Sequence, residues 1–139
     1  MTHTYLSQEW QTLQQCHEQH ERNALHVKLT SVVLFVLGVG LLLPAGILAF
    51  CTISLWAIEA VFKTYQSRIA ERMLRVEALM AQPAPGAAAM QLHTEWTLQR
   101  PGTAGLLASY ARSACKPTVA FPYLFLMLLA VFGIPPYGP

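Results

Sequence analysis

Two long apolar stretches divide the chain, and polar segments with helical periodicity flank them. Residues 29–57 and 118–134 contain no charged residue. A helix of about 20 apolar residues crosses the ~30 Å hydrocarbon core of a bilayer. Residues 1–28 are mostly polar and the apolar run after them is too long for a signal-peptide core, so a cleaved signal peptide is not expected. The pattern predicts a helical integral membrane protein.

The first apolar stretch has the length of one over-long span or of two short ones. Its centre, residues 38–46, contains Pro44 and three glycines. Proline with flexible glycines favours a tight turn over the middle of a helix. We therefore expect one helix from about residue 26 to 43 and a second from about 47 to 62, each about 25 Å long. Together they would form a transmembrane hairpin.

Amphipathic segments continue both predicted spans into the aqueous phase. Apolar side chains recur there at three- and four-residue spacing, which is typical of amphipathic helices. They are Leu6, Trp10, Leu13, Phe62, Tyr65, Ile69, Met73 and Val76. Two antiparallel helices can bury such stripes against one another or against other copies of the chain. For any single residue we expect packing within the chain.

A linker follows the hairpin. Residues 82–89 are rich in proline and alanine and end the second helix near Ala81. From Met90 to Gln99 apolar and polar residues alternate, which is typical of a short β-strand. A single strand leaves its backbone hydrogen bonds unmade unless a neighbouring copy pairs with it. We therefore weigh such a strand against an interfacial amphipathic coil anchored by Trp96, and expect the coil.

The C-terminal part predicts a short helix over residues 104–114 and a third span over residues 118–134, with Pro117 in its first turn. The expected fold class is an all-α membrane protein, a transmembrane helical hairpin with cytoplasmic helical extensions plus a C-terminal third span. The parts are the amphipathic N-terminal helix and hairpin (1–81), a cytoplasmic linker (82–103), and the juxtamembrane helix with the last span (104–139).

Charge placement predicts the orientation. The chain is 54% hydrophobic and 12% charged, far from an average soluble domain. Basic residues accumulate on the cytoplasmic side of bacterial membrane proteins. Here they flank one end of every predicted span, at Arg22, Lys28, Lys63, Arg68, Arg72, Arg75, Arg112 and Lys116. We expect a multi-pass protein of the bacterial inner membrane, with the N-terminus and residues 64–116 in the cytoplasm. A single first span would export Arg22 and Lys28.

Glu59 is an acid about one turn inside the apolar end of the second predicted span. Charges at that depth are costly and often functional. Arg22 or Lys28 on the partner helix would pair with Glu59. We expect a structural ion pair, and a functional one is the alternative.

Metal-ligand residue types concentrate at residues 16–21, the run Cys-His-Glu-Gln-His-Glu. On a helix, His17 and His20 would share a face and supply two ligands of a metal site. Two ligands do not close a site, and only His93 or another subunit would add to them. We therefore expect a solvated helix face, with no metal and no other cofactor.

Small and aromatic residues along the hairpin are candidate contacts between copies, because small residues let helices approach closely. The candidates are Trp10, Gly38, Gly40, Phe62, Tyr65, Ile69 and Trp96. The expected partners are membrane lipid, further copies of the chain in a homo-oligomer, and a cytoplasmic protein. No nucleic acid is expected.

The segment Trp56–Phe62, followed by Gln66 and Arg68, resembles a signature of uncharacterised bacterial inner-membrane proteins. In that group, a tryptophan near the end of the second span precedes an acidic residue by three positions. An aromatic-rich last span, comparable to residues 121–123, completes the likeness. The hairpin is also similar to SLATT-type two-span effectors of nucleotide-signalled antiphage systems. That similarity implies assembly into membrane-disrupting pores.

The chain departs from the signature at Glu59, where aspartate is usual, and at Ser67, where a basic residue is usual. Together with the one-sided charge, the resemblance predicts a non-enzymatic, oligomeric membrane effector or pore-forming subunit of a bacterial antiphage defence system. The alternative is an accessory or anchoring subunit of a larger membrane complex for secretion, conjugation or respiration. A membrane enzyme that uses His17, His20 and Glu59 is a third hypothesis.

Overall fold

A computed structural model describes residues 2–82, 90–99 and 101–133. These residues form helices, with no strand among them, so the predicted all-α class is confirmed. The elements are α1 (Thr2–Gly40), α2 (Ala45–Met80), α3 (Leu92–Gln99), α4 (Thr103–Ala114), α5 (Pro117–Leu128) and the π-helical turn η1 (Leu129–Gly133).

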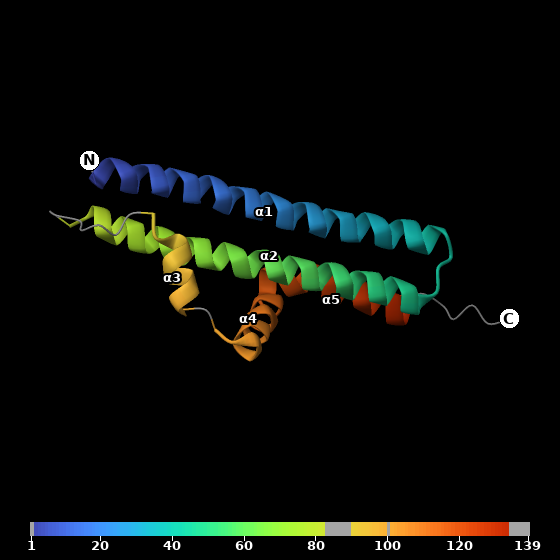
Figure 1. Cartoon of the computed structure of the whole chain (residues 1–139). Helices are drawn as coiled ribbons and strands as arrows, with labels where there is room; N and C mark the ends of the chain where they lie inside the picture. Colours follow the sequence, from blue (N-terminus) through green and yellow to red (C-terminus); the bar gives the residue numbers. More distant parts are fainter. Residues whose placement is uncertain (1, 83–89, 100, 134–139) are drawn as a thin grey trace.

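The first two helices form the predicted hairpin and lie antiparallel along their whole length (Figure 1). The turn falls where the proline and the glycines predict it. Leu42 adopts a left-handed φ of 56°, which ends α1. Pro44 lacks a backbone N–H and therefore precedes α2 as its N-cap.

Both hairpin helices are long and apolar enough to cross a membrane. They contain 39 and 36 residues, so at ~1.5 Å per residue each is much longer than the hydrocarbon core is thick. About half of each helix would therefore lie outside the hydrocarbon core, as the amphipathic pattern predicts. We call the half next to the turn the membrane half and the other the aqueous half.

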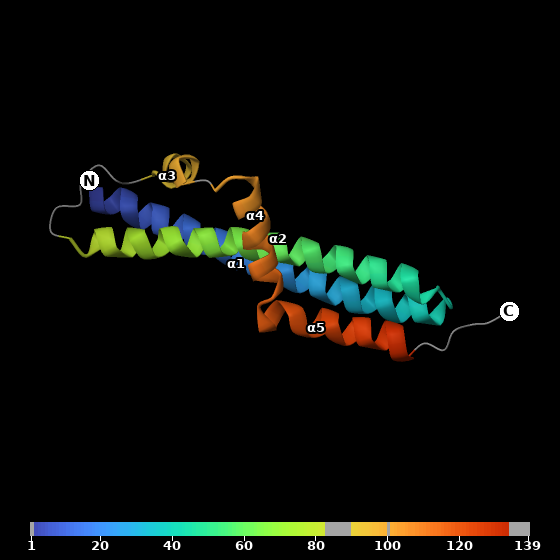
Figure 2. The same ribbon diagram turned by 90° about the horizontal axis from the view of Figure 1, so that it is seen from below.

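The expected third span corresponds to α5 and η1, which lie against the membrane half of the hairpin (Figure 2). Pro117–Gly133 is short for a membrane span. Together with α4 it is long and apolar enough to cross a membrane, but the two segments are bent by 73° relative to one another. The described residues thus contain two candidate spans, or three if the bent pair forms one. Residues 134–139, which include the predicted end of this span, lie outside the described residues.

Two apolar clusters hold the bundle together. In the membrane half, Phe35 and Leu48 of the hairpin pack with Leu126 and Ala130. In the aqueous half, the amphipathic stripes of α1 and α2 meet around Leu6, Leu13, Val76, Trp10, Ile69 and Met73. The predicted packing of these stripes within the chain is confirmed for these residues, whereas Tyr65 of the same stripe is exposed. In the aqueous half, burial of such side chains contributes about 25 cal/mol per Å² of apolar surface removed from water.

The alternating segment Met90–Gln99 is neither the strand nor the coil considered above. Its residues 92–99 form α3. A helix makes its backbone hydrogen bonds locally, as between Glu95 N–H and the Gln91 carbonyl, whereas a lone strand has no partner. Contacts of Glu95 and Trp96 with α2 then fix this short helix on the hairpin. Residues 83–89, the proline- and alanine-rich part of the linker, lie outside the described residues.

Candidate functional site

A buried polar junction joins three helices at the end of the membrane half. Glu59 of α2 is fully buried. Its Oε1 lies 3.2 Å from Lys28 Nζ of α1, and its Oε2 accepts a hydrogen bond of 2.7 Å from the Tyr123 hydroxyl of α5. Of the two partners expected for Glu59, the structure therefore selects Lys28. Arg22 is exposed and forms no ion pair with the described residues.

Lys28 and Trp56 extend this junction to the start of α5 and the end of α4. Lys28 Nζ donates to the Thr118 carbonyl at 2.9 Å. The Trp56 indole stacks on the Tyr123 ring, with centroids 6.1 Å apart, and donates to the Ala114 carbonyl at 3.2 Å. We call Lys28, Trp56, Glu59 and Tyr123 the polar junction. Its hydrogen bonds connect the end of α4 and the start of α5 to the hairpin.

Two buried oxygens at this level lack a hydrogen-bond donor among the described residues. The approach of Lys28 to Glu59 Oε1 is an ion-pair contact without hydrogen-bond geometry, and Oε1 has no other donor. Ser31 Oγ, one turn beyond Lys28 on α1, is also buried without a partner. A buried carboxylate with incomplete hydrogen bonding is destabilising relative to a hydrated one. At Glu59 the junction rests on one hydrogen bond, from Tyr123, and one ion pair, with Lys28.

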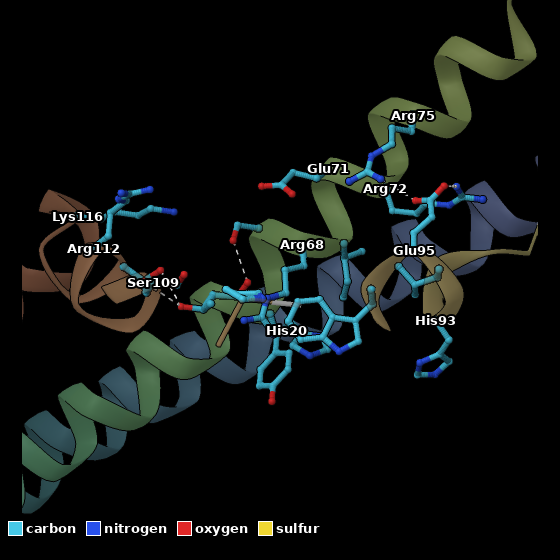
Figure 3. Close-up of a pocket in the computed structure, with 18 residues that line it drawn as sticks. His20, Arg68, Glu71, Arg72, Arg75, His93, Glu95, Ser109, Arg112 and Lys116 are labelled. Atoms are coloured by element: carbon cyan, nitrogen blue, oxygen red, sulfur yellow. Dashed lines mark hydrogen bonds and ion pairs between the residues drawn. The ribbon is translucent and has the colours of Figure 1, made fainter. Parts of the chain in front are cut away.

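A second feature is a cleft of about 630 Å³ on the aqueous half, between α2, α3 and α4 (Figure 3). Cationic side chains outnumber acidic ones in its lining. The cations are Arg68, Arg72, Arg75, Arg112 and Lys116, and the acids are Glu71 and Glu95. We call this feature the cationic cleft.

At one end of the cleft the charges neutralise one another. Arg72, which is buried, donates to Glu9 Oε1 at 2.9 Å and to Glu95 Oε1 at 2.6 Å. Arg75 donates to the other oxygen of Glu95 at 2.7 Å. Glu9 Oε2 also accepts from the Met90 backbone N–H at 2.6 Å. This network ties α1, α2 and α3 together and is structural.

The middle of the cleft is formed by Arg68 between two aromatic rings. Its guanidinium carbon lies 3.9 Å from the centroid of the Trp96 ring and 5.1 Å from that of Tyr65. Such cation–π contacts contribute about 0.5–2 kcal/mol each. They fix α3 over α2 and leave the edge N–H groups of the guanidinium for other acceptors.

The opposite end of the cleft, at the end of α4, carries the exposed Arg112 and Lys116 (Figure 3). Neither forms an ion pair with a described residue. Beside them, Thr64 Oγ1 and Ser113 Oγ lie 2.8 Å apart and join α4 to α2. This end of the cleft thus has a rigid floor and two cations without a counter-charge.

The candidate oligomer contacts have mixed positions. Several of them make contacts within the chain. Trp10 donates a hydrogen bond of 2.8 Å to Glu77, and the Phe62 ring packs edge-on to His20. A Cβ at Gly38 would overlap Leu48. Ile69 belongs to the apolar cluster of the aqueous half, and Trp96 lies over Arg68. Gly40 and Tyr65 are exposed. Contacts between copies stay a prediction.

The histidine-rich segment lies along α1. His20 Nδ1 is 2.8 Å from the Cys16 carbonyl oxygen, one turn away, and His17 is half-buried. His93 is on α3 and lines the cationic cleft. In the part of the chain that the structure describes, no three His, Cys, Asp or Glu side chains come together as a metal site.

Sequence reasoning missed the cleft and two members of the polar networks. Arg68, Arg72 and Arg75 recur at helical spacing, as do Arg112 and Lys116, and this signal predicts cationic faces. Nothing in the local sequence marks Glu9 or Tyr123, because their partners are more than 60 residues away.

The layout of the hairpin and the segment Trp56–Phe62 carry the resemblance to SLATT-type effectors. In the structure, Trp56 and Glu59 of that segment both belong to the polar junction. A scan against protein-family models and searches of curated proteins and of solved structures found no match to the chain, so this resemblance stays a prediction.

Proposed function

We propose that the chain is a non-enzymatic membrane effector of a bacterial antiphage defence system. In this proposal, several copies assemble in the inner membrane through the hairpin. At high density the assembly breaches the membrane by itself, and a cytoplasmic partner or signal that acts on the aqueous half lowers the density required.

The observation that supports this proposal best is the continuity of α2. The helix runs unbroken from Ala45 to Met80, contributes Glu59 to the polar junction, and lines the cationic cleft with Arg68 and Arg72. Packed helices shift as rigid units between discrete arrangements. An event at the cleft would therefore displace the junction in the membrane half.

Exposed apolar side chains support association in the bilayer. They project outward from all three helices of the membrane half, at Leu29, Val33, Leu37, Phe50, Ile53, Phe121, Phe125 and Leu128. In a membrane such faces meet lipid or further helices. The same faces would suit the alternative function, an accessory or anchoring subunit of a larger complex.

The breach requires a rearrangement. Ser31, Thr52 and Glu59, which are polar enough to line a water-filled path, are buried in the bundle. Opening would separate α5 from the hairpin and break the hydrogen bond between Tyr123 and Glu59.

Inducible expression in bacterial cells, with a membrane-potential dye as the readout, tests the proposal. Expression should depolarise the cells. Tyr123→Phe, which removes the closing hydrogen bond, should depolarise them more at equal protein in the membrane fraction. Tyr110→Phe is the matched control on α4 and should behave as the wild type.

An unchanged potential for every variant would contradict the effector proposal. If, in addition, the chain purifies as one copy with a different membrane protein in fixed ratio, the accessory-subunit alternative gains.

A further inference from the structure

The outer end of the cationic cleft has positive charge that no carboxylate neutralises. Arg112 and Lys116 lie four residues apart, are exposed, and have no ion-pair partner among the described residues. Arg68 faces the same cleft with the edge of its guanidinium unblocked by the Trp96 ring. Of the two acids in the lining, Glu95 is already held by the arginines at the inner end.

Two serine hydroxyl groups of the cleft already donate to backbone carbonyls. Ser67 donates to the Thr64 carbonyl, and Ser109 donates to the Gly105 carbonyl. The charged donors that face the cleft are the arginine and lysine side chains. Guanidinium groups match the oxygens of a phosphate in geometry and form short, charge-assisted hydrogen bonds with it.

This end of the cleft lies at the boundary between the charged part of the chain and its last apolar segment. Lys116 directly precedes the apolar helix α5, whose first carbonyls accept a hydrogen bond from Lys28 of the junction. The 73° bend turns α4 away from the direction of the span. Apart from Arg112, its exposed residues are small or apolar, with Leu107 68% exposed. Such a helix lies in the interfacial plane, at the level of lipid headgroups.

We propose that Arg68, Arg112 and Lys116 form a binding site for a phosphate group at the mouth of the cationic cleft. The position at headgroup depth favours an anionic phospholipid as the source, since basic pockets beside cytoplasmic helix ends bind such headgroups. A free phosphate would satisfy the same side chains. The site goes beyond the proposed function and is independent of it, because a chain that binds phosphate without depolarising any membrane would still satisfy it.

The test is native mass spectrometry of the full-length chain in detergent, titrated with phosphatidylglycerol or with phosphatidylcholine, whose phosphate is accompanied by a cation. The wild type should bind phosphatidylglycerol roughly tenfold more tightly. Arg112→Gln/Lys116→Gln should lose that preference, and Arg112→Lys/Lys116→Arg should keep it.

The matched control is Arg22→Gln/Lys63→Gln, which removes two cations from a different hollow between α1 and α2 and should leave binding unchanged. If the glutamine double variant loses helicity by circular dichroism, the single variants Arg112→Gln and Lys116→Gln replace it, each with a roughly threefold loss of affinity.

A second arm titrates inorganic phosphate alone, followed by calorimetry. Phosphate binding that the Arg112→Gln/Lys116→Gln variant loses, without preference between the two lipids, would support the site and assign it to a soluble phosphate. Equal binding of both lipids with no phosphate binding would overturn the proposal. An equal loss in the cleft variant and in the control would also overturn it, because diffuse surface charge would then account for the binding.

Discussion

At the residue scale, Glu59 is fully buried and has two unequal partners. Tyr123 donates a hydrogen bond to one carboxylate oxygen of Glu59. Lys28, whose side chain is 26% exposed, forms an ion pair with the other oxygen but no hydrogen bond. Removing one member of a buried pair costs more than the pair contributes, because the remaining charge loses its compensation. The energetic coupling between the two residues is therefore the informative quantity.

A double-mutant cycle with Glu59→Gln and Lys28→Gln should give a coupling free energy of about 1–3 kcal/mol in thermal unfolding in detergent. The cycle with Arg22→Gln in place of Lys28→Gln should give a coupling near zero, because Arg22 does not contact Glu59. Equal coupling in both cycles would mean that Glu59 responds to the general positive charge of α1 and not to one partner.

Gly38 and Gly40 are two turn-proximal glycines in different surroundings. A Cβ at Gly38 would overlap the Leu48 side chain, whereas a Cβ at Gly40 meets nothing within 4 Å. Gly38→Ala should therefore lower the free energy of unfolding by about 1–3 kcal/mol through overpacking. Gly40→Ala should be neutral or slightly stabilising, because alanine is the better helix former. Thermal unfolding of both variants in detergent measures the difference. Equal effects at the two positions would contradict the close packing of Leu48 against Gly38.

At the element scale, the sequence predicted the hairpin well because its signals are local. Charge-free stretches give the spans, Pro44 gives the turn, and three- to four-residue spacing gives the aqueous extensions. The sequence left the partner of Glu59 open between Arg22 and Lys28 of α1. These two residues are about 9 Å apart along the helix axis. Which of them lies beside Glu59 depends on the register of the two hairpin helices, which the sequence does not give.

The segment Met90–Gln99 was predicted wrongly for the opposite reason. Its period-two alternation is a weak local signal, and tertiary contacts override it. Glu95 lies where two arginines of α2 meet it, and Trp96 lies over Arg68. The cationic cleft was out of reach of sequence reasoning because it forms only where α3 and α4 pack against α2.

The position of α3 on α2 depends on the side-chain contacts of Glu95 and Trp96. Glu95→Gln should weaken its pairing with Arg72 and Arg75 and raise amide hydrogen exchange over residues 92–99. The matched control is Glu71→Gln, an exposed acid of the same cleft, and it should leave exchange unchanged. Unchanged exchange in Glu95→Gln would show that another interaction holds α3.

At the scale of the whole molecule, the chain has an apolar half and a charged half, and the polar junction lies where they meet. Three helices converge there on one buried carboxylate, and α2 continues from it into the cationic cleft. This arrangement suits a protein in which the aqueous half controls the packing of α5 in the membrane half. The closed bundle hides its polar residues, and an open one would expose them.

We propose that separation of α5 from the hairpin lets the assembled protein breach a membrane. Purified wild type and Tyr123→Phe, reconstituted in liposomes that carry a potassium diffusion potential, test it most directly. Both should dissipate the potential, with a steeper than linear dependence on protein density, and Tyr123→Phe should do so at lower density because its closed state is weaker. A potential that persists for both proteins at every density would contradict the account.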